Sequence, residues 1–193
     1  TISRQYGSFG RLVAKKLSEQ LHIDFLDRDI VEETAKRMNT SVKQISREEE
    51  ITHSKFSYLS YPFGLGTPDV SDEIFLVQQS IIEDFARKGS CIIVGRCGAY
   101  CLRNEPRLRR VYIYAPYEVR LKNCVEYFGM TGKEAVRAVN ESDKAREHYH
   151  KKYIPGYQSD TLNSDLCINS AYYSIEEAAE LITQAARMKF GEI

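Results

Sequence analysis

The chain has 193 residues, of which 42% are hydrophobic and 28% are charged, and these values are ordinary for one globular domain with a full core. Its 27 basic and 27 acidic residues give a formal net charge of +0, so no overall electric field attracts nucleic acid or an anionic membrane. Any anion-binding site must therefore be a local cluster of cationic side chains.

Cysteine content and hydropathy narrow the class of protein further. The five cysteines are odd in number and irregularly spaced, which predicts reduced thiols in a cytoplasmic protein rather than a disulfide framework. No apolar run approaches the roughly 18 residues of a membrane span, and no signal peptide is visible. The chain opens on Thr1 without a methionine, which leaves open that a few residues of the natural first strand precede it.

The start of the chain follows the pattern of a strand, a loop and a helix. Residues 1–3 are predicted to end a strand, Gly7 and Gly10 mark the loop, and residues 11–21 place apolar side chains on one helical face. The free N–H groups at a helix start bind anions, phosphate above all, and Arg4 and Arg11 add positive charge. The stretch lies where a phosphate-binding loop belongs, but it lacks the Gly-Lys-Ser/Thr ending of a standard one.

The next part of the chain is predicted to contain one strand, several helices and one unusual loop. The strand covers residues 22–27 and continues a right-handed βαβ unit. Residues 53–68 are aromatic and contain glycine and proline, which is typical of a binding loop or an oligomer contact. The predicted helices are 29–38, 41–51 and 70–88.

The second half alternates strands with helices. The apolar run 91–94 is typical of a central parallel strand buried on both faces, and Gly95-Arg96 follows it. The charged, tyrosine-rich stretch 140–157 is predicted to be a helical arm over the site. Together the elements predict a three-layer α/β fold with a mostly parallel sheet. The remaining predicted elements are strands over 109–114 and 165–169 and helices that start within 115–118, cover 129–139 and cover 174–188.

Arginines stand at the predicted strand ends and loop edges, and several of them would converge on one cleft. Guanidinium groups bind phosphate oxygens through paired hydrogen bonds, and phosphoryl transfer needs dispersed positive charge and exclusion of water. Each arginine alone could equally be a surface ion-pair partner. The cluster comprises Arg4, Arg11, Arg28, Arg96, Arg120 and Arg146.

Two histidines, His148 and His150, lie among tyrosines in the predicted arm. They could ligate a metal, but we interpret them as part of a solvated face of the arm. We therefore assign no metal-ligating residue.

Short motifs cover nearly the whole chain in one order. They are Ile2-Ser3-Arg4-Gln5-Tyr6-Gly7-Ser8-Phe9-Gly10-Arg11, Ala14-Lys15-Lys16-Leu17, Phe25-Leu26-Asp27-Arg28, Ile92-Ile93-Val94-Gly95-Arg96-Cys97-Gly98-Ala99-Tyr100, Val111-Tyr112-Ile113-Tyr114-Ala115-Pro116, Asp143-Lys144-Ala145-Arg146-Glu147-His148-Tyr149, Ser164-Asp165-Leu166-Cys167-Ile168-Asn169 and Ser174-Ile175-Glu176-Glu177-Ala178-Ala179. In this order the chain resembles the cytidylate kinase-like proteins, a branch of the P-loop nucleoside monophosphate kinases.

The resemblance implies a single nucleotide-kinase-like domain, residues 1–193, with a P-loop NTPase-like α/β fold. Its core would comprise 1–30, 89–135 and 160–193, its insert for the nucleoside monophosphate (NMP) about 31–88, and its helical lid about 136–159. The implied reaction transfers the γ-phosphate of ATP to CMP, dCMP or a related small acceptor with Mg²⁺. The implied partner is a small-molecule nucleotide, with no nucleic acid polymer and no membrane, and a homodimer is left open.

The resemblance also implies roles for individual residues. The catalytic residues would be Arg11, Asp143 and Arg146. The acceptor would be bound by Asp27, Arg28 and Arg96. The phosphates of ATP would be bound by Arg4, Tyr6, Gly7, Ser8, Gly10, Arg11, Leu12 and Arg120.

The phosphate loop departs from the family pattern, in which the loop ends Gly-Lys-Gly-Thr. Gly10 stands where the lysine belongs, Leu12 where the Mg²⁺-binding threonine belongs, and Phe9 where a glycine is usual. Arg11 could replace the charge of the lysine. These changes leave two alternatives open: a catalytically impaired nucleotide-binding or regulatory protein with the same fold, or an interaction protein that dimerises through residues 53–68.

Overall fold

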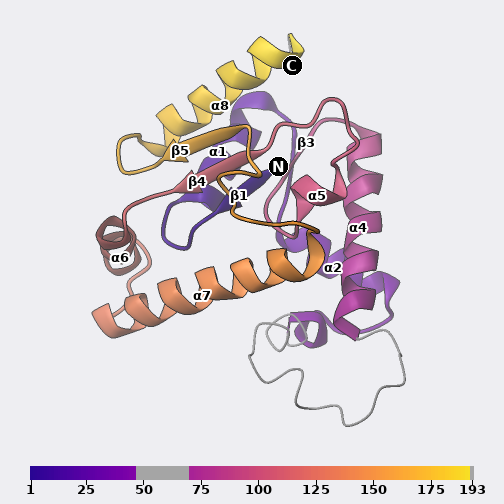
Figure 1. Cartoon of the computed structure of the whole chain (residues 1–193), viewed down its shortest axis with the longest axis horizontal. Coiled ribbons are helices and arrows are strands. Elements are labelled where there is room, and N and C mark those ends of the chain that lie inside the picture. Colours follow the sequence, from indigo (N-terminus) through magenta and orange to yellow (C-terminus); the bar gives the residue numbers. More distant parts are fainter. Residues whose placement is uncertain (47–69, 192–193) are drawn as a thin grey trace.

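The computed structural model describes residues 1–46 and 70–191 (Figure 1), so the aromatic stretch 53–68 lies outside the described residues. The strands are β1 (Ile2–Arg4), β2 (Asp24–Leu26), β3 (Cys91–Ile93), β4 (Val111–Tyr114) and β5 (Leu166–Asn169). The helices are α1 (Gly10–Leu21), α2 (Arg28–Arg37), α4 (Val70–Lys88), α5 (Gly98–Cys101), α6 (Tyr117–Glu126), α7 (Gly132–Tyr153) and α8 (Ile175–Phe190).

The strands form a parallel sheet in the order β2-β3-β1-β4-β5. β1 pairs with β4, β4 with β5, and β2 with β3. A parallel bridge between Ile2 and Val94 joins the two groups, and the Gly95 N–H donates to the Ile2 carbonyl at 3.0 Å. β1 therefore lies in the middle of the sheet, with the end of β3 on one side and β4 on the other.

Helices cover both faces of this sheet, which confirms the predicted three-layer α/β fold. α1 and α8 pack against each other on one face, and Figure 1 shows α4 and α7 on the other. Alternate side chains of β3 supply both cores: Ile92 packs with α1 and α8, whereas Ile93 packs with α4 and α5. The predicted continuous apolar run is thus a strand buried on both faces.

The arm is longer and more regular than the sequence pattern indicated. Instead of a helix ending at Val139 and a separate charged stretch, α7 is one helix of 22 residues. Thr131 caps it in a capping box with Glu134. His148 is exposed, but His150 is only 6% exposed, so the interpretation of a solvated face is wrong for His150.

The C-terminal end of α7 packs against α4. The rings of Phe75 and Tyr153 stack at 4.1 Å, and the Lys152 ammonium lies 2.8 Å from the Asp72 carboxylate. α7 therefore extends from α6, against which it packs, to α4 (Figure 1). None of the helices in the described ranges has the length and apolarity needed to cross a bilayer.

Ile113 tests the contribution of the central core, because its side chain is fully buried on β4. We expect Ile113→Ala to lower the free energy of unfolding by about 2–5 kcal/mol through lost burial and a residual cavity. Urea unfolding monitored by circular dichroism measures this change. Met188→Ala, at a side chain that is 89% exposed, serves as the control and should change stability by less than about 0.5 kcal/mol.

Candidate functional site

The loop between β1 and α1 is held by contacts with α6 and β4. The Asn123 amide donates to the Gly7 carbonyl at 2.8 Å. The Ser8 side chain is fully buried, and its hydroxyl lies 2.9 Å from the Gln5 carbonyl and 3.0 Å from the Ile113 carbonyl. Gly7 has φ +78°, and a Cβ there would lie 2.7 Å from the Arg120 carbonyl. The hydroxyl of Ser8 therefore points into the fold, and only the backbone of Ser8 can face a ligand.

Phe9 holds an unusual backbone conformation at the start of α1. It has φ 60° and ψ 10°, the left-handed region that residues with a Cβ seldom adopt. Its ring meets Tyr127 edge-on at 4.9 Å and Phe128 at 6.2 Å, so it faces the turn between α6 and α7. These aromatic contacts hold the residue that replaces the usual glycine.

Arg4 and Gly10 are linked by close packing. A Cβ at Gly10 would lie 2.5 Å from the Cβ of Arg4, so a lysine at position 10 does not fit beside this arginine. In the standard phosphate loop a glycine precedes the lysine by six residues, the spacing that separates Arg4 from Gly10. The chain therefore carries an arginine where the standard loop has its first glycine, and a glycine where it has its lysine.

A small cavity of about 160 Å³ opens at the carboxyl ends of β1 and β3. Burial and the neighbouring Arg146 lower the pKa of Arg4 to about 9, which indicates a crowded positive charge. Gly95 permits this crowding, because a Cβ there would collide with the Arg4 guanidinium. The charged residues that line the cavity are Arg4, Asp27, Arg96 and Arg146, and the others are Ser3, Val94, Gly95, Tyr149 and His150.

The turn after β3 contains three consecutive residues in the left-handed backbone region. Gly95, Arg96 and Cys97 have φ values of 76°, 52° and 52°. A residue with a Cβ in this region costs about 1–3 kcal/mol, and such strain is found at functional sites. The sequence pattern Gly-Arg indicated a strand end but not this left-handed turn.

Asp143 joins α7 to the phosphate loop. Its Oδ1 accepts the Tyr6 N–H at 2.8 Å, and its Oδ2 accepts a hydrogen bond from Arg120 Nη1. Arg120 also donates to the Tyr6 carbonyl at 3.2 Å and to the Ala115 carbonyl at 3.1 Å. Its side chain is only 8% exposed, so Arg120 holds the loop and Asp143.

Arg146 lies one turn further along α7. Its Nη1 donates to the Arg4 carbonyl at 3.0 Å and lies 3.5 Å from Asp143 Oδ1. Burial lowers the pKa of Arg146, and the Asp143 carboxylate opposes this shift. Arg4 and Arg146 also line a second cavity of about 210 Å³, together with Asp143, Glu147 and Asp160.

The structure brings some of the predicted site residues together and separates others. Arg4, Asp27, Arg96 and Arg146 share the small cavity, and Asp143 lines the cavity beside it. Arg11 is 58% exposed and pairs with Asp27 at 2.6 Å. Arg28 is exposed at the start of α2 and lines neither cavity, and Leu12 is half-buried in the first turn of α1.

Sequence reasoning missed several residues of this site. Asn123 lies three residues after Arg120 on α6, and His150 lies four residues after Arg146 on α7. Residues at these spacings share one face of a helix, so the arginines could have pointed to both. Tyr149 also lines the cavity, but its spacing alone gave no signal.

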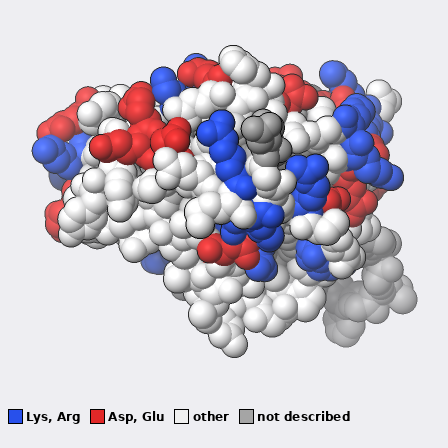
Figure 2. Space-filling model, turned by 90° about the horizontal axis from the view of Figure 1, so that it is seen from above, with Lys and Arg blue, Asp and Glu red and all other residues white. Residues whose placement is uncertain are grey.

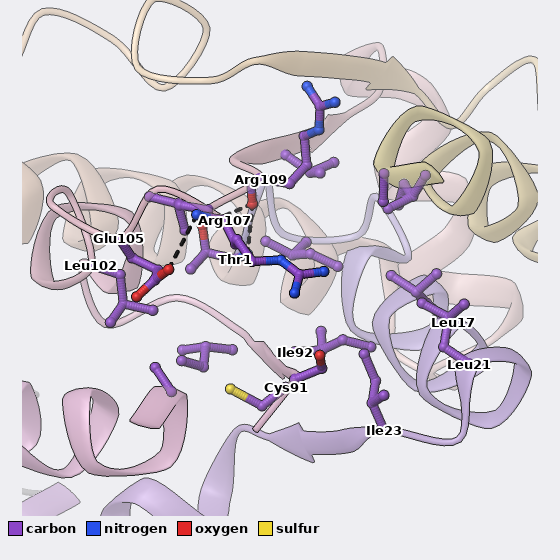
Figure 3. Close-up of a pocket in the computed structure, with 18 of the residues that line it drawn as sticks. Thr1, Leu17, Leu21, Ile23, Cys91, Ile92, Leu102, Glu105, Arg107 and Arg109 are labelled. Carbon is purple, nitrogen blue, oxygen red and sulfur yellow. Dashed lines mark hydrogen bonds between the residues drawn. The ribbon is translucent and has the colours of Figure 1, made fainter. Parts of the chain in front are cut away.

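A third cavity, of about 370 Å³, lies at the opposite ends of the strands (Figure 3). Leu17, Leu21, Ile23 and Ile92 contribute to its lining, which contains none of the predicted site residues. Figure 2 shows acidic and basic side chains in mixed groups on the upper face, in agreement with the balanced net charge. Of the arginines predicted for the site, Arg4, Arg96 and Arg146 line the cavities at the carboxyl ends of the strands.

Solved structures with similar folds define the class. A protein of uncharacterised function from Eubacterium ventriosum has a TM-score of 0.71 and 25% identity, with 96% of this chain and 95% of that chain covered. A shikimate kinase from Acinetobacter baumannii, solved with shikimate, has a TM-score of 0.53 and 15% identity over 98% of this chain and 92% of its own. The fold is therefore that of the P-loop kinases.

Within this class, the chain belongs to the cytidylate kinase-like family, whose model matches residues 1–172. It is also similar to the cytidylate kinase of Aeropyrum pernix, with 23% identity over 188 residues, which cover 97% of this chain and 98% of that protein. The resemblance drawn from the ordered motifs is thereby confirmed.

Gly95 allows a direct test of the arginine cavity. We expect Gly95→Ala to weaken pyrophosphate binding at least tenfold, because the new Cβ displaces the Arg4 guanidinium, and to destabilise the protein by about 1–3 kcal/mol through the positive φ. Calorimetric titration with pyrophosphate, at a temperature where both proteins are folded, measures the affinity. Gly89→Ala is the matched control, because a Cβ there has nothing within 4 Å, and it should leave pyrophosphate affinity unchanged.

Proposed function

We propose that this protein is a nucleoside monophosphate kinase that transfers the γ-phosphate of ATP to CMP, dCMP or a related small acceptor. The observation that carries the proposal is the convergence of Arg4, Arg96 and Arg146 on one cavity beside the phosphate loop. Guanidinium groups arranged in this way bind phosphate oxygens and stabilise the charge that develops in phosphoryl transfer. Membership of the cytidylate kinase-like family supports the choice of acceptor.

In this proposal the cavity and the neighbouring phosphate loop bind different phosphates. Arg96 holds the phosphate of the acceptor, with Asp27 and Arg28 on the acceptor side. The backbone from Tyr6 to Leu12 holds the phosphates of ATP, and Arg146 reaches the transferred group. Residues 31–88 form the NMP-binding insert, and residues 136–159 form the lid.

Arg4, rather than Arg11, is the better candidate to supply the charge of the missing lysine. Arg4 lies against Gly10, lines the cavity and has a pKa lowered to about 9 by burial and Arg146. Arg11 is mostly exposed and pairs with Asp27. A bound phosphate would relieve the repulsion between Arg4 and Arg146, which favours binding of the anion.

The loop fits phosphoryl groups better than it fits Mg²⁺. The side chain of Leu12 contains no oxygen that could bind a metal, and the Ser8 hydroxyl is buried against backbone carbonyls. The nearby carboxylates, Asp27 and Asp143, are paired with Arg11 and Arg120. We therefore assign no step to a metal held by these residues.

A nucleotide-binding protein without turnover is the second candidate. The replacement of the loop lysine by Gly10 and of the threonine by Leu12 favours it, because the lysine binds the β- and γ-phosphates and the threonine holds Mg²⁺. A dimerising interaction protein would depend on residues 53–68, which lie outside the described residues.

A coupled assay of ADP release across a panel of nucleoside monophosphates separates these candidates. We expect CMP or dCMP to stimulate ATP turnover more than AMP, GMP or UMP. If no monophosphate stimulates turnover while ATP or CMP raises the melting temperature, the kinase proposal fails and the binding protein remains.

The acceptor site is tested by Arg96→Ala. Loss of this guanidinium from the cavity should raise the KM for the monophosphate at least tenfold, about 1.4 kcal/mol of binding energy, with a change of less than about threefold in the KM for ATP. Arg103→Ala is the control, because Arg103 is exposed beyond α5 and lines neither cavity. Unchanged monophosphate binding in Arg96→Ala would contradict the assignment.

A further inference from the structure

The carboxylate of Asp143 is held like a bound oxyanion. The Tyr6 N–H donates to Oδ1, Arg120 Nη1 donates to Oδ2, and Arg146 Nη1 lies 3.5 Å from Oδ1. These three donors come from the phosphate loop, α6 and α7. A backbone N–H with two guanidinium groups is also a donor set that binds phosphoryl oxygens.

Most of this donor set is fixed without help from Asp143. Arg120 is bonded to the Ala115 and Tyr6 carbonyls and is almost fully buried. The loop that carries the Tyr6 N–H is held by the bond from Asn123 to the Gly7 carbonyl. Arg146 is anchored by its bond to the Arg4 carbonyl. The donors therefore stay in place when the short side chain of Asp143 rotates away.

We propose that Asp143 is an internal competitor for an oxyanion site formed by the Tyr6 N–H, Arg120 and Arg146, and that the terminal phosphoryl group of a polyphosphate chain displaces it. The ligand class is a di- or triphosphate, and this inference rests on the proposed function of the loop. In the ligand-free protein the carboxylate neutralises the guanidinium charges, and on binding the phosphoryl oxygens take its place. The affinity for the phosphate chain is thus lowered by the work of displacing Asp143.

The neighbouring acid Glu147 offers a matched control. Glu147 is also on α7 and lines the same cavity of about 210 Å³ as Asp143, Arg4 and Arg146. Its carboxylate is exposed and pairs with Lys151 at 2.6 Å rather than with the loop. Neutralising Glu147 therefore removes one negative charge from the same region without emptying the oxyanion site.

Calorimetric titration of pyrophosphate into wild type, Asp143→Asn and Glu147→Gln, without ATP or acceptor, tests the inference. We expect Asp143→Asn to bind pyrophosphate at least tenfold more tightly than wild type, and Glu147→Gln to differ from wild type by less than threefold. The ligand-free Asp143→Asn protein should also melt at a lower temperature than wild type, and pyrophosphate should raise its melting temperature by more. Equal affinities of the two variants, or weaker binding by Asp143→Asn, would overturn the inference.

A measurement on the wild-type protein covers the case in which Asp143→Asn does not fold. In ¹⁵N-resolved NMR, pyrophosphate should shift the Tyr6 amide resonance, because its acceptor changes from a carboxylate to a phosphoryl oxygen, whereas the Gly89 amide should not move. Binding of pyrophosphate that leaves the Tyr6 amide unchanged would contradict the inference.

These outcomes separate the inference from the proposed function. Tighter binding by Asp143→Asn without ADP release in any protein would support the internal competitor and contradict the kinase. ADP release stimulated by a monophosphate, with equal pyrophosphate affinities in the two variants, would support the kinase and contradict the internal competitor.

Discussion

The central place of β1 in the parallel sheet is the constraint on which the candidate site depends. β1 pairs with β4 and is bridged to the end of β3, so the residues that follow these three strands meet at one edge. Arg4 ends β1, Gly95 and Arg96 follow β3, and Ala115 follows β4. Open parallel sheets bind their ligands outside the carboxyl ends of their strands, and here the strand order concentrates cationic side chains at that edge.

The packing around Arg4 accounts for the unusual residues of the phosphate loop. Arg4 takes the space into which a side chain at position 10 would project, and Gly95 leaves room for its guanidinium. The arginine at position 4 therefore fits only with a glycine, or with no large side chain, at position 10. Under the proposed function, Arg4 at the end of β1 supplies the positive charge that a lysine in the first turn of α1 would supply.

The acidic side chains at this edge balance the arginines. Asp27 pairs with Arg11, and Asp143 pairs with Arg120 and lies near Arg146. Removing charge from water is costly unless each group finds a partner, and these internal anions supply partners for the arginines. α7 provides one of them and, through its contacts with α4, connects the loop to the predicted insert.

Much of the fold could be predicted because the signals are local. The apolar run of β3, the helical periodicity of α1 and the capping box of α8 depend on neighbouring residues and on the alternation of strands with helices. The order of the motifs likewise indicated the family before any contact was known. The start of α7 was predicted near Thr131, but its continuation past Val139 to Tyr153 was missed, because the dense charge of 140–157 resembles a separate arm.

By itself, the sequence determined the class of fold, the family and the set of arginines at the strand ends, since these follow from residue type and order. Only the tertiary structure decided where each side chain points. It turned Ser8 and Arg120 inward, directed Arg11 to Asp27, buried His150 and placed Asp143 against the Tyr6 N–H. The physical reason is that several of these contacts join residues more than a hundred positions apart, such as Ser8 with Ile113, Arg120 with Tyr6 and Tyr6 with Asp143, and no local pattern records them.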